Sequence, residues 1–162
     1  MLNAASKILS ADISAIKPET TDLKRPIVFT NGCFDILHRG HITYLETARN
    51  LGNSLIVGVN TDASVKRQNK GNNRPINNQE DRQAILAALA CIDAVVVFDE
   101  DTPLKLITTI SPDILVKGGD WEVENIVGAE HVLNNGGQVH SIDFEHNRST
   151  TQLINKIRST TP

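Results

Sequence analysis

Two histidines three residues apart are the side chains of this sequence best suited to chemistry. His38 and His41 lie in the run GCFDILHRGH, residues 32–41, which joins an apolar stretch to an amphipathic one. If a helix begins there, both imidazoles project toward one side of its first turn. Gly32 and Gly40 allow backbone and ligand to approach closely, and a helix N-terminus carries a partial positive charge. The pattern therefore predicts a site for an anionic phosphate chain.

The same two histidines have plainer interpretations, as caps of a helix or as ligands of a metal ion. A phosphate site would act by in-line positioning and by stabilising charge on phosphorus oxygens and on a leaving pyrophosphate. A nucleophile that is already ionised would need no general base. Six identities within ten positions, in the pattern G-x-F-D-x-x-H-x-G-H, favour the phosphate site.

Alternating strands and helices must position these residues. Buried strands, each apolar on both faces, are expected over 25–32, 53–62, 91–100, 112–121 and 138–144. Helices are expected over 39–51, 79–90, 102–111, 127–137 and 148–159, with a short helix and a basic loop within 62–75. This alternation predicts an α/β fold, a Rossmann-like three-layer α/β/α sandwich around a mostly parallel five-stranded sheet. Its ligands would bind beyond the carboxyl ends of the strands, where the strand order switches.

Length and composition narrow the class of protein. The 162 residues suit one domain, with a short polar helix and connector over 1–25 and a catalytic core over 26–158. The formal charge of −3 argues against a general nucleic-acid binder. No apolar run approaches the ~20 residues of a membrane helix. The absence of a signal-like N-terminus and the wide separation of Cys33 and Cys91 favour a cytoplasmic location, without a disulfide framework or zinc site.

The motif resembles the signature of the cytidylyltransferase-like nucleotidyltransferases, distant relatives of the class I aminoacyl-tRNA synthetases. Residues 27–157 also resemble the adenylyltransferase domain of the bifunctional heptose kinase/adenylyltransferases. The matching runs are TNGCFDILHRGH, LIVGVNTDASVKR, RPIN, DTPLKLI, PDILVKGGDW and STTQLINKI. This resemblance implies transfer of AMP from ATP to D-glycero-β-D-manno-heptose 1-phosphate, giving ADP-heptose and pyrophosphate for lipopolysaccharide or another heptose glycan. It implies a stand-alone adenylyltransferase whose kinase is a separate protein.

The resemblance also implies site residues. Its catalytic positions match His38, His41 and Lys66, and its nucleotide-binding positions match Asn31, Gly32, Cys33, Phe34, Gly40, Arg74, Gly118, Asp120, Ser149 and Thr150. Arg82 and Arg148 are weaker candidates. Mg²⁺ is expected to arrive with ATP, so no protein metal site is expected. Relatives often dimerise, which implies a homodimer.

Several of these residues keep a structural interpretation beside the functional one. The carboxylate of Asp35 would repel phosphate, so bracing its loop is the favoured role. Ser149 and Thr150 could cap the last helix as well as bind phosphate. Trp121 could cover a sugar or base, or seal a hydrophobic edge, and Arg82 could make a surface ion pair. The loop after Lys66 reads Gln68-Asn69-Lys70-Gly71 where relatives commonly have Leu-Lys-Gly, which leaves its lysine register open.

Other functions stay open at this stage. The same chemistry could use glycerol phosphate with CTP, or a flavin or pantetheine phosphate with ATP. The chain could also be a nucleotide-binding module without catalysis. A tRNA synthetase fragment is disfavoured, because the sequence has no KMSKS-like lysine loop.

Overall fold

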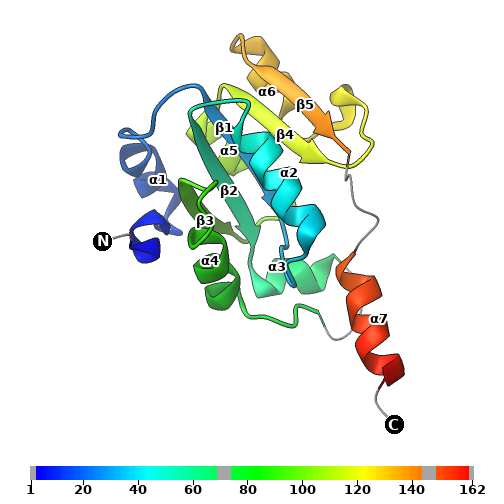
Figure 1. The fold of residues 1–162 in the computed structure, drawn as a ribbon. Helices are drawn as coiled ribbons and strands as arrows, with labels where there is room; N and C mark the ends of the chain where they lie inside the picture. The colour runs from blue at the N-terminus through cyan, green and yellow to red at the C-terminus, as the bar shows by residue number, and fades with distance from the viewer. Residues whose placement is uncertain (1–2, 69–73, 144–148, 161–162) are drawn as a thin grey trace.

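The computed structural model describes residues 3–68, 74–143 and 149–160. Its centre is one parallel sheet with the strand order β3-β2-β1-β4-β5 (Figure 1). The strands are β1 (Ile27–Gly32), β2 (Ser54–Asn60), β3 (Ala94–Phe98), β4 (Ile114–Gly118) and β5 (Gln138–Ile142). The chain adds β2 and β3 on one side of β1 and then β4 and β5 on the other. The switch in strand order therefore lies between β1 and β4, where ligands of such sheets bind.

Helices cover both faces of the sheet (Figure 1). One apolar core joins the sheet to α1 (Ile13–Glu19), α5 (Leu104–Ile110) and α6 (Ala129–Asn134). A second core joins the other face to α2 (Arg39–Arg49) and α4 (Gln79–Ala87). The remaining short elements are η1 (Ala4–Lys7), α3 (Asp62–Arg67) and η2 (Val123–Asn125). The last helix, α7 (Thr150–Thr160), projects from the rest of the domain (Figure 1). The predicted three-layer sandwich is confirmed.

Alternation along β1 shows why a buried parallel strand is apolar at successive positions. Phe29 belongs to the core under α5, whereas its neighbour Val28 belongs to the core under α2. Both are 0% exposed. The hydroxyl of Tyr44 in α2 lies 2.6 Å from that of Thr30, which fixes α2 against β1. The predicted helix at 39–51 thus packs where the histidines need support.

Two details differ from the expectations. β5 is not buried on both faces: its residues are exposed or half-buried, in keeping with the polar side chains of Gln138, His140 and Ser141. The N-terminal segment contains two short helices, η1 and α1, rather than one. Between them Leu9 donates its N–H to the carbonyl of Val95 at 2.8 Å, so this segment lies along the β3 edge of the sheet. In the described ranges no helix is long and apolar enough to cross a membrane.

Candidate active site

The turn from β1 into α2 brings the two histidines together. The rings of His38 and His41 stack, with centroids 3.9 Å apart and planes 22° from parallel. Phe34 meets the His41 ring edge-on, with centroids 5.5 Å apart. His38 is the extended residue before the first turn of α2, so both rings lie at the helix N-terminus. This matches the predicted placement of both imidazoles on one side of the first turn.

Burial keeps these imidazoles neutral at pH 7. It is the main cause that lowers the pKa of His41 to about 4, with smaller contributions from His38 and Arg74. Burial also lowers the pKa of His38. A neutral imidazole still has one N–H donor. The pair therefore offers hydrogen bonds in the ligand-free protein, while positive charge comes from the helix N-terminus and from nearby cations.

The turn itself adopts a conformation that most side chains avoid. Phe34 has φ of 46°, in the left-handed region, although it is not a glycine. Its ring folds back over Gly32, where an added Cβ would lie 3.0 Å from the ring. Strained residues of this kind persist where the surrounding structure holds them, and they cluster at functional sites. The bracing residues are therefore part of the site.

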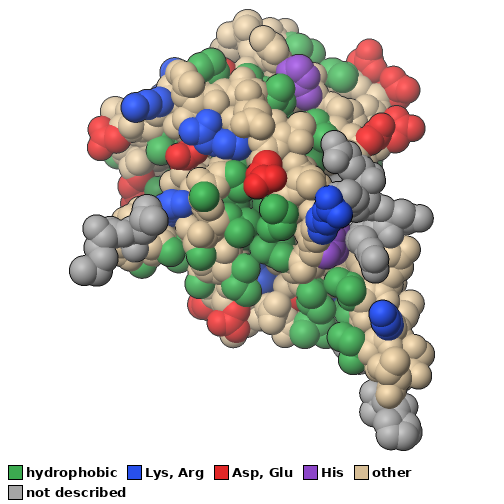
Figure 2. All heavy atoms as spheres, viewed as in Figure 1, with side chains coloured by type: hydrophobic (Ala, Val, Ile, Leu, Met, Phe, Trp, Pro, Cys, Tyr) green, Lys and Arg blue, Asp and Glu red, His purple; other side chains and the backbone are tan. Residues whose placement is uncertain are grey.

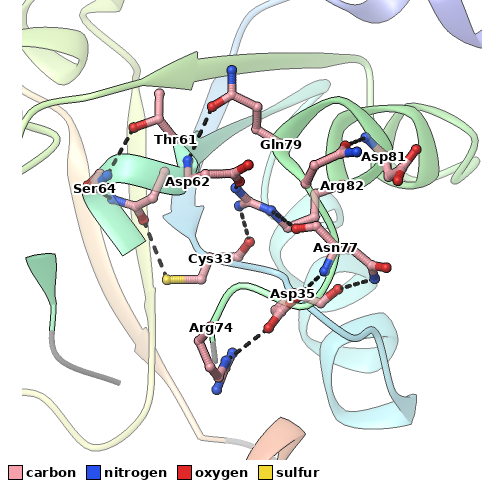
Figure 3. Close-up of polar contacts among 12 residues, drawn as sticks. Cys33, Asp35, Thr61, Asp62, Ser64, Arg74, Asn77, Gln79, Asp81 and Arg82 are labelled. Atoms are coloured by element: carbon pink, nitrogen blue, oxygen red, sulfur yellow. Dashed lines mark hydrogen bonds and ion pairs between the residues drawn. The ribbon is translucent and has the colours of Figure 1, made fainter. Parts of the chain in front are cut away.

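Asp35 is one of these braces (Figure 3). Its side chain is fully buried, and it accepts hydrogen bonds from the backbone N–H groups of Ile76 at 2.8 Å and Asn77 at 2.9 Å. It also pairs with Nε of Arg74 at 2.9 Å. The predicted loop-bracing role is confirmed. The same contact places Arg74, predicted to bind nucleotide, beside the turn and close enough to act on His41.

Arg82 is a second brace, and the alternative interpretation of it as a surface ion pair is wrong. Its side chain is fully buried, and its Nη2 pairs with Asp62 of α3 at 2.6 Å. Its Nη1 donates to the Cys33 carbonyl at 2.7 Å, and its Nε donates to the Asn77 carbonyl at 3.1 Å. One guanidinium thus ties the turn to two other segments (Figure 3). The sequence held a signal for this: Arg82 lies one turn before Leu86, on the apolar face of α4.

A cavity of about 180 Å³ adjoins the turn at the carboxyl ends of β1, β2 and β4. Among the predicted site residues, Asn31 lines it. The thiol of Cys33 points toward two further lining residues, with Sγ 3.4 Å from Oε1 of Gln68 and 3.9 Å from Oδ1 of Asn60. The site was predicted at the switch in strand order, and this cavity lies there. Gln68 is a lining residue that the motif analysis missed.

The other predicted residues lie on or beside α3, β4, α7 and α2. Lys66 is exposed on the last turn of α3, and Gly118 ends β4 with exposed Asp120 close behind. Ser149 begins α7, where its hydroxyl accepts from the Gln152 N–H and its own N–H donates to the Gln152 side chain, both at 3.1 Å. This reciprocal pair is a capping box. Gly40 is buried in the first turn of α2.

Thr150 ties α7 to the histidine turn. Its side chain donates to the Ile36 carbonyl at 3.1 Å, and the residue is buried. The capping interpretation of Ser149 therefore holds, and Thr150 carries an anchoring role that the sequence did not indicate. Both also bring an open helix N-terminus beside the turn. Arg148, the remaining candidate, lies outside the described residues, as does Lys70 of the loop whose lysine register was left open.

Comparison with known proteins agrees with this geometry. The family model described as cytidylyltransferase-like matches residues 29–160. The chain is 52% identical to the D-beta-D-heptose 1-phosphate adenylyltransferase of Bordetella bronchiseptica, over 94% of both proteins. It is 56% identical to the bifunctional protein HldE of Citrifermentans bemidjiense, over 95% of this chain. It spans about a third of that longer relative, which it covers to 32%.

Solved structures show the same fold. A lipopolysaccharide core biosynthesis protein from Thermoplasma volcanium superposes with a TM-score of 0.59 at 30% identity, over 75% of this chain and 98% of the other. A pantoate-beta-alanine ligase from Francisella tularensis superposes with a TM-score of 0.60 over 94% of this chain and 78% of the other. Because the identity is 15%, this match supports the fold alone. With its signature turn, its sheet order and these matches, the chain belongs to the cytidylyltransferase-like family.

Proposed function

We propose that this protein transfers AMP from ATP to D-glycero-β-D-manno-heptose 1-phosphate, releasing ADP-heptose and pyrophosphate. The observation that carries the proposal is the 52% identity to a D-beta-D-heptose 1-phosphate adenylyltransferase along 94% of both chains. The stacked histidines at an open helix N-terminus supply a site of the kind that this chemistry requires. The product would serve lipopolysaccharide or another heptose glycan.

The reaction is an in-line exchange at the α-phosphorus of ATP. An oxygen of the sugar phosphate forms a bond to that phosphorus while the bond to the bridging oxygen breaks, and pyrophosphate leaves with its electron pair. A phosphate monoester has its second pKa near ~6, so the nucleophile is ionised at pH 7 without a general base. The protein must therefore position the two substrates and stabilise the charge on the phosphates.

The residues divide this work by their chemistry. His38 and His41 donate N–H groups to the phosphate oxygens, and the first turn of α2 adds backbone N–H groups and its dipole. Lys66 neutralises charge on the α- and β-phosphates. Two further groups of residues complete the nucleotide site. One is the backbone of Asn31, Gly32, Cys33, Phe34 and Gly40, and the other consists of Arg74, Gly118, Asp120, Ser149 and Thr150.

Mg²⁺ enters this scheme as the ion carried by ATP. We assign this ion to the phosphate oxygens of ATP rather than to a cage of protein carboxylates. Its chemistry would be to neutralise charge on the phosphates. We further propose a homodimer in the cytoplasm, where ATP is available, with neither nucleic acid nor membrane as a partner.

The test is detection of ADP-heptose by mass spectrometry after the protein is mixed with ATP, Mg²⁺ and the β-1-phosphate. A panel of four nucleotides against heptose 1-phosphate, glycerol phosphate and pantetheine phosphate tests the choice of substrates. ADP-heptose from the ATP–heptose pair, at a higher kcat/KM than any other pair, is expected. A higher kcat/KM for another pair would show that the proposed acceptor or the proposed nucleotide is wrong. Tight ATP binding without pyrophosphate release from any acceptor would instead indicate a non-catalytic module.

A further inference from the structure

Trp121 lies half-exposed on the wall of the cavity beside the histidine turn. It is the single tryptophan of the sequence, and 48% of its surface is exposed. Val127, another of the exposed large hydrophobic residues at 41%, lines the same cavity. An exposed aromatic ring on the wall of a hollow is typical of a site whose ligand covers it.

The remaining wall of the cavity is rich in amides. Asn31, Asn60, Gln68 and Asn125 line it, together with Lys117 and Asp101. An amide offers both donors and acceptors, so it can bond to a hydroxyl in either direction. Polyhydroxylated rings need such partners around their edge and an apolar surface against their C–H face. The cavity supplies both kinds of surface.

The size and position of the cavity separate it from the phosphate site. About 180 Å³ is less than the ~300 Å³ at the lower end for drug-sized ligands, so a sugar-sized group fits better than a whole nucleotide. The histidines do not line this cavity. Asn31 connects the two, because it lines the cavity and directly precedes Gly32 in β1. A sugar in the cavity would thus have its phosphate directed at the turn.

The backbone before Trp121 is built to hold the ring in this place. Gly119 has φ of 110°, which L side chains rarely adopt, and an added Cβ would lie 3.1 Å from the indole nitrogen. The indole N–H donates to the Gly118 carbonyl at 3.2 Å, and the Trp121 N–H donates to Ser141 Oγ at 3.0 Å. The hydroxyl of Ser141 donates in turn to the Gly119 carbonyl. The ring is therefore oriented before any ligand arrives.

We propose that this cavity binds the sugar ring of the acceptor, with the Trp121 indole packed on its C–H face and the amides bonded to its hydroxyls. Trp121 is then a specificity residue for the sugar phosphate rather than for ATP. This inference rests on the proposed function, because it assigns the second substrate of the same reaction.

Tryptophan fluorescence tests the inference without turnover, because the emission comes from Trp121 alone. The full chain is titrated with heptose 1-phosphate, with and without an ATP analogue that has a methylene between the α- and β-phosphorus atoms. A saturable blue shift on adding the sugar phosphate is expected, since the ligand removes water from the indole. Inorganic phosphate should leave the emission unchanged. A shift caused by the ATP analogue with none from the sugar phosphate, or no shift from either, would overturn the inference.

Kinetics of two variants separate ligand contact from a merely structural role. Trp121→Phe keeps an aromatic face and loses the hydrogen bond to Gly118, whereas Trp121→Ala loses both. We expect the KM for the sugar phosphate to rise about tenfold in the Ala variant and much less in the Phe variant, with the KM for ATP unchanged. Equal losses in both variants, confined to kcat, would show that the ring only supports its turn. Leu133→Ala, at an equally exposed 48% position on α6, is the matched control.

The two proposals fail in different ways. If the wild-type protein makes ADP-heptose but the sugar phosphate does not change its tryptophan emission, the inference about Trp121 is wrong and the proposed reaction stands. If the sugar phosphate shifts the emission and no ADP-heptose forms with ATP, the proposed reaction fails while the sugar site stands. Gly119→Ala sharpens the result, because the new methyl group would push the indole aside and should weaken the response to the sugar phosphate.

Discussion

The histidine turn and the Trp121 wall form two neighbouring parts of one site, and they are built differently. The turn is braced by two buried charged side chains. Asp35 makes three polar contacts to residues 74–77, and Arg82 contacts Asp62, the Cys33 carbonyl and the nearby Asn77 carbonyl. The wall that Trp121 forms is held by one hydrogen bond within its own turn and by Ser141 of β5, and its aromatic ring is half-exposed. The difference matches the tasks proposed for them. Phosphate chemistry requires donors fixed in advance, whereas sugar recognition requires an open surface.

The ion pairs of the exposed surface, one face of which Figure 2 shows, contrast with those that brace the turn. Charged side chains are spread over the visible face, while hydrophobic atoms gather in its middle. The pairs of Arg67 with Asp101 and of Lys105 with Glu100 are exposed, unlike those of Arg82 and Arg74. Exposed pairs contribute little to stability, whereas a buried ion is costly once its partner is removed. This gives a direct way to test which charges hold the site.

The largest expected effect follows from removing the buried guanidinium. Arg82→Met should lower the free energy of unfolding by about 3–5 kcal/mol, because it leaves Asp62 and the Cys33 carbonyl without their partner. Chemical denaturation measures this value. Arg67→Met, at an exposed ion pair, is the control and should leave the unfolding midpoint unchanged. Equal losses in the two variants would mean that Arg82 does not brace the turn.

The next effect concerns the reaction and leaves the fold intact. His41→Ala should lower kcat about 10²–10³-fold, because it removes one positioned donor to the phosphates. Pyrophosphate release measures kcat, and circular dichroism checks the fold. His140→Ala, on β5, should keep wild-type turnover. Wild-type turnover in the His41 variant would remove the histidine pair from the mechanism.

A smaller effect is expected in the dependence of stability on pH. The folded state holds the pKa of His41 near 4, below its ordinary value of 6.5. The unfolded state therefore binds more protons between these values, and the contribution of His41 to stability is complete above pH 6.5 and lost as the pH falls toward 4. The loss is on the order of 3 kcal/mol. His41→Gln should flatten the unfolding free energy over this range, and an unchanged slope would contradict the assigned burial.

The smallest effect is expected at the N-terminus of α7, which Thr150 ties to the histidine turn. Ser149→Ala should cost about 1 kcal/mol, because it removes one half of the capping box with Gln152. Hydrogen exchange of the α7 amides should report the loss locally. Thr151→Ala, at the exposed neighbouring position, serves as the control. A rise in the KM for ATP in the Ser149 variant, beyond that of the control, would support a role in phosphate binding besides capping.

Regular periodicity made most of the fold predictable. The apolar runs at β1, β2 and β4 are bounded by glycine, proline or asparagine and the run at β3 by aspartates, so their strands and the parallel sheet followed from them. The burial of β5 was predicted less well, because only Val139 and Ile142 are apolar in Gln138–Ile142 and the strand is exposed or half-buried throughout. The N-terminal segment was also harder, since its alignment with β3 depends on a long-range contact of Leu9.

The site was predictable where a motif named it and obscure where packing decides. The histidine pair was predicted from the six identities of its motif, since the spacing of the two histidines alone also fitted a helix cap or a metal site. The role of Asp35 followed from charge, since a carboxylate does not favour phosphate. The burial of Arg82 depends on which helix face meets the sheet, and the part of Gln68 in the cavity depends on how α3 ends. Neither the burial of Arg82 nor the position of Gln68 can be inferred from the type of the residue.

Nuclear magnetic resonance of the histidine side chains tests the central claim most directly. The sequence has five histidines, and their imidazole signals can be followed during titration with ATP and Mg²⁺. The account predicts that the signals of His38 and His41 shift on binding and that the pKa of His41 rises from about 4, because phosphate favours the protonated ring. Signals of His38 and His41 that stay unmoved at saturating ATP would contradict it.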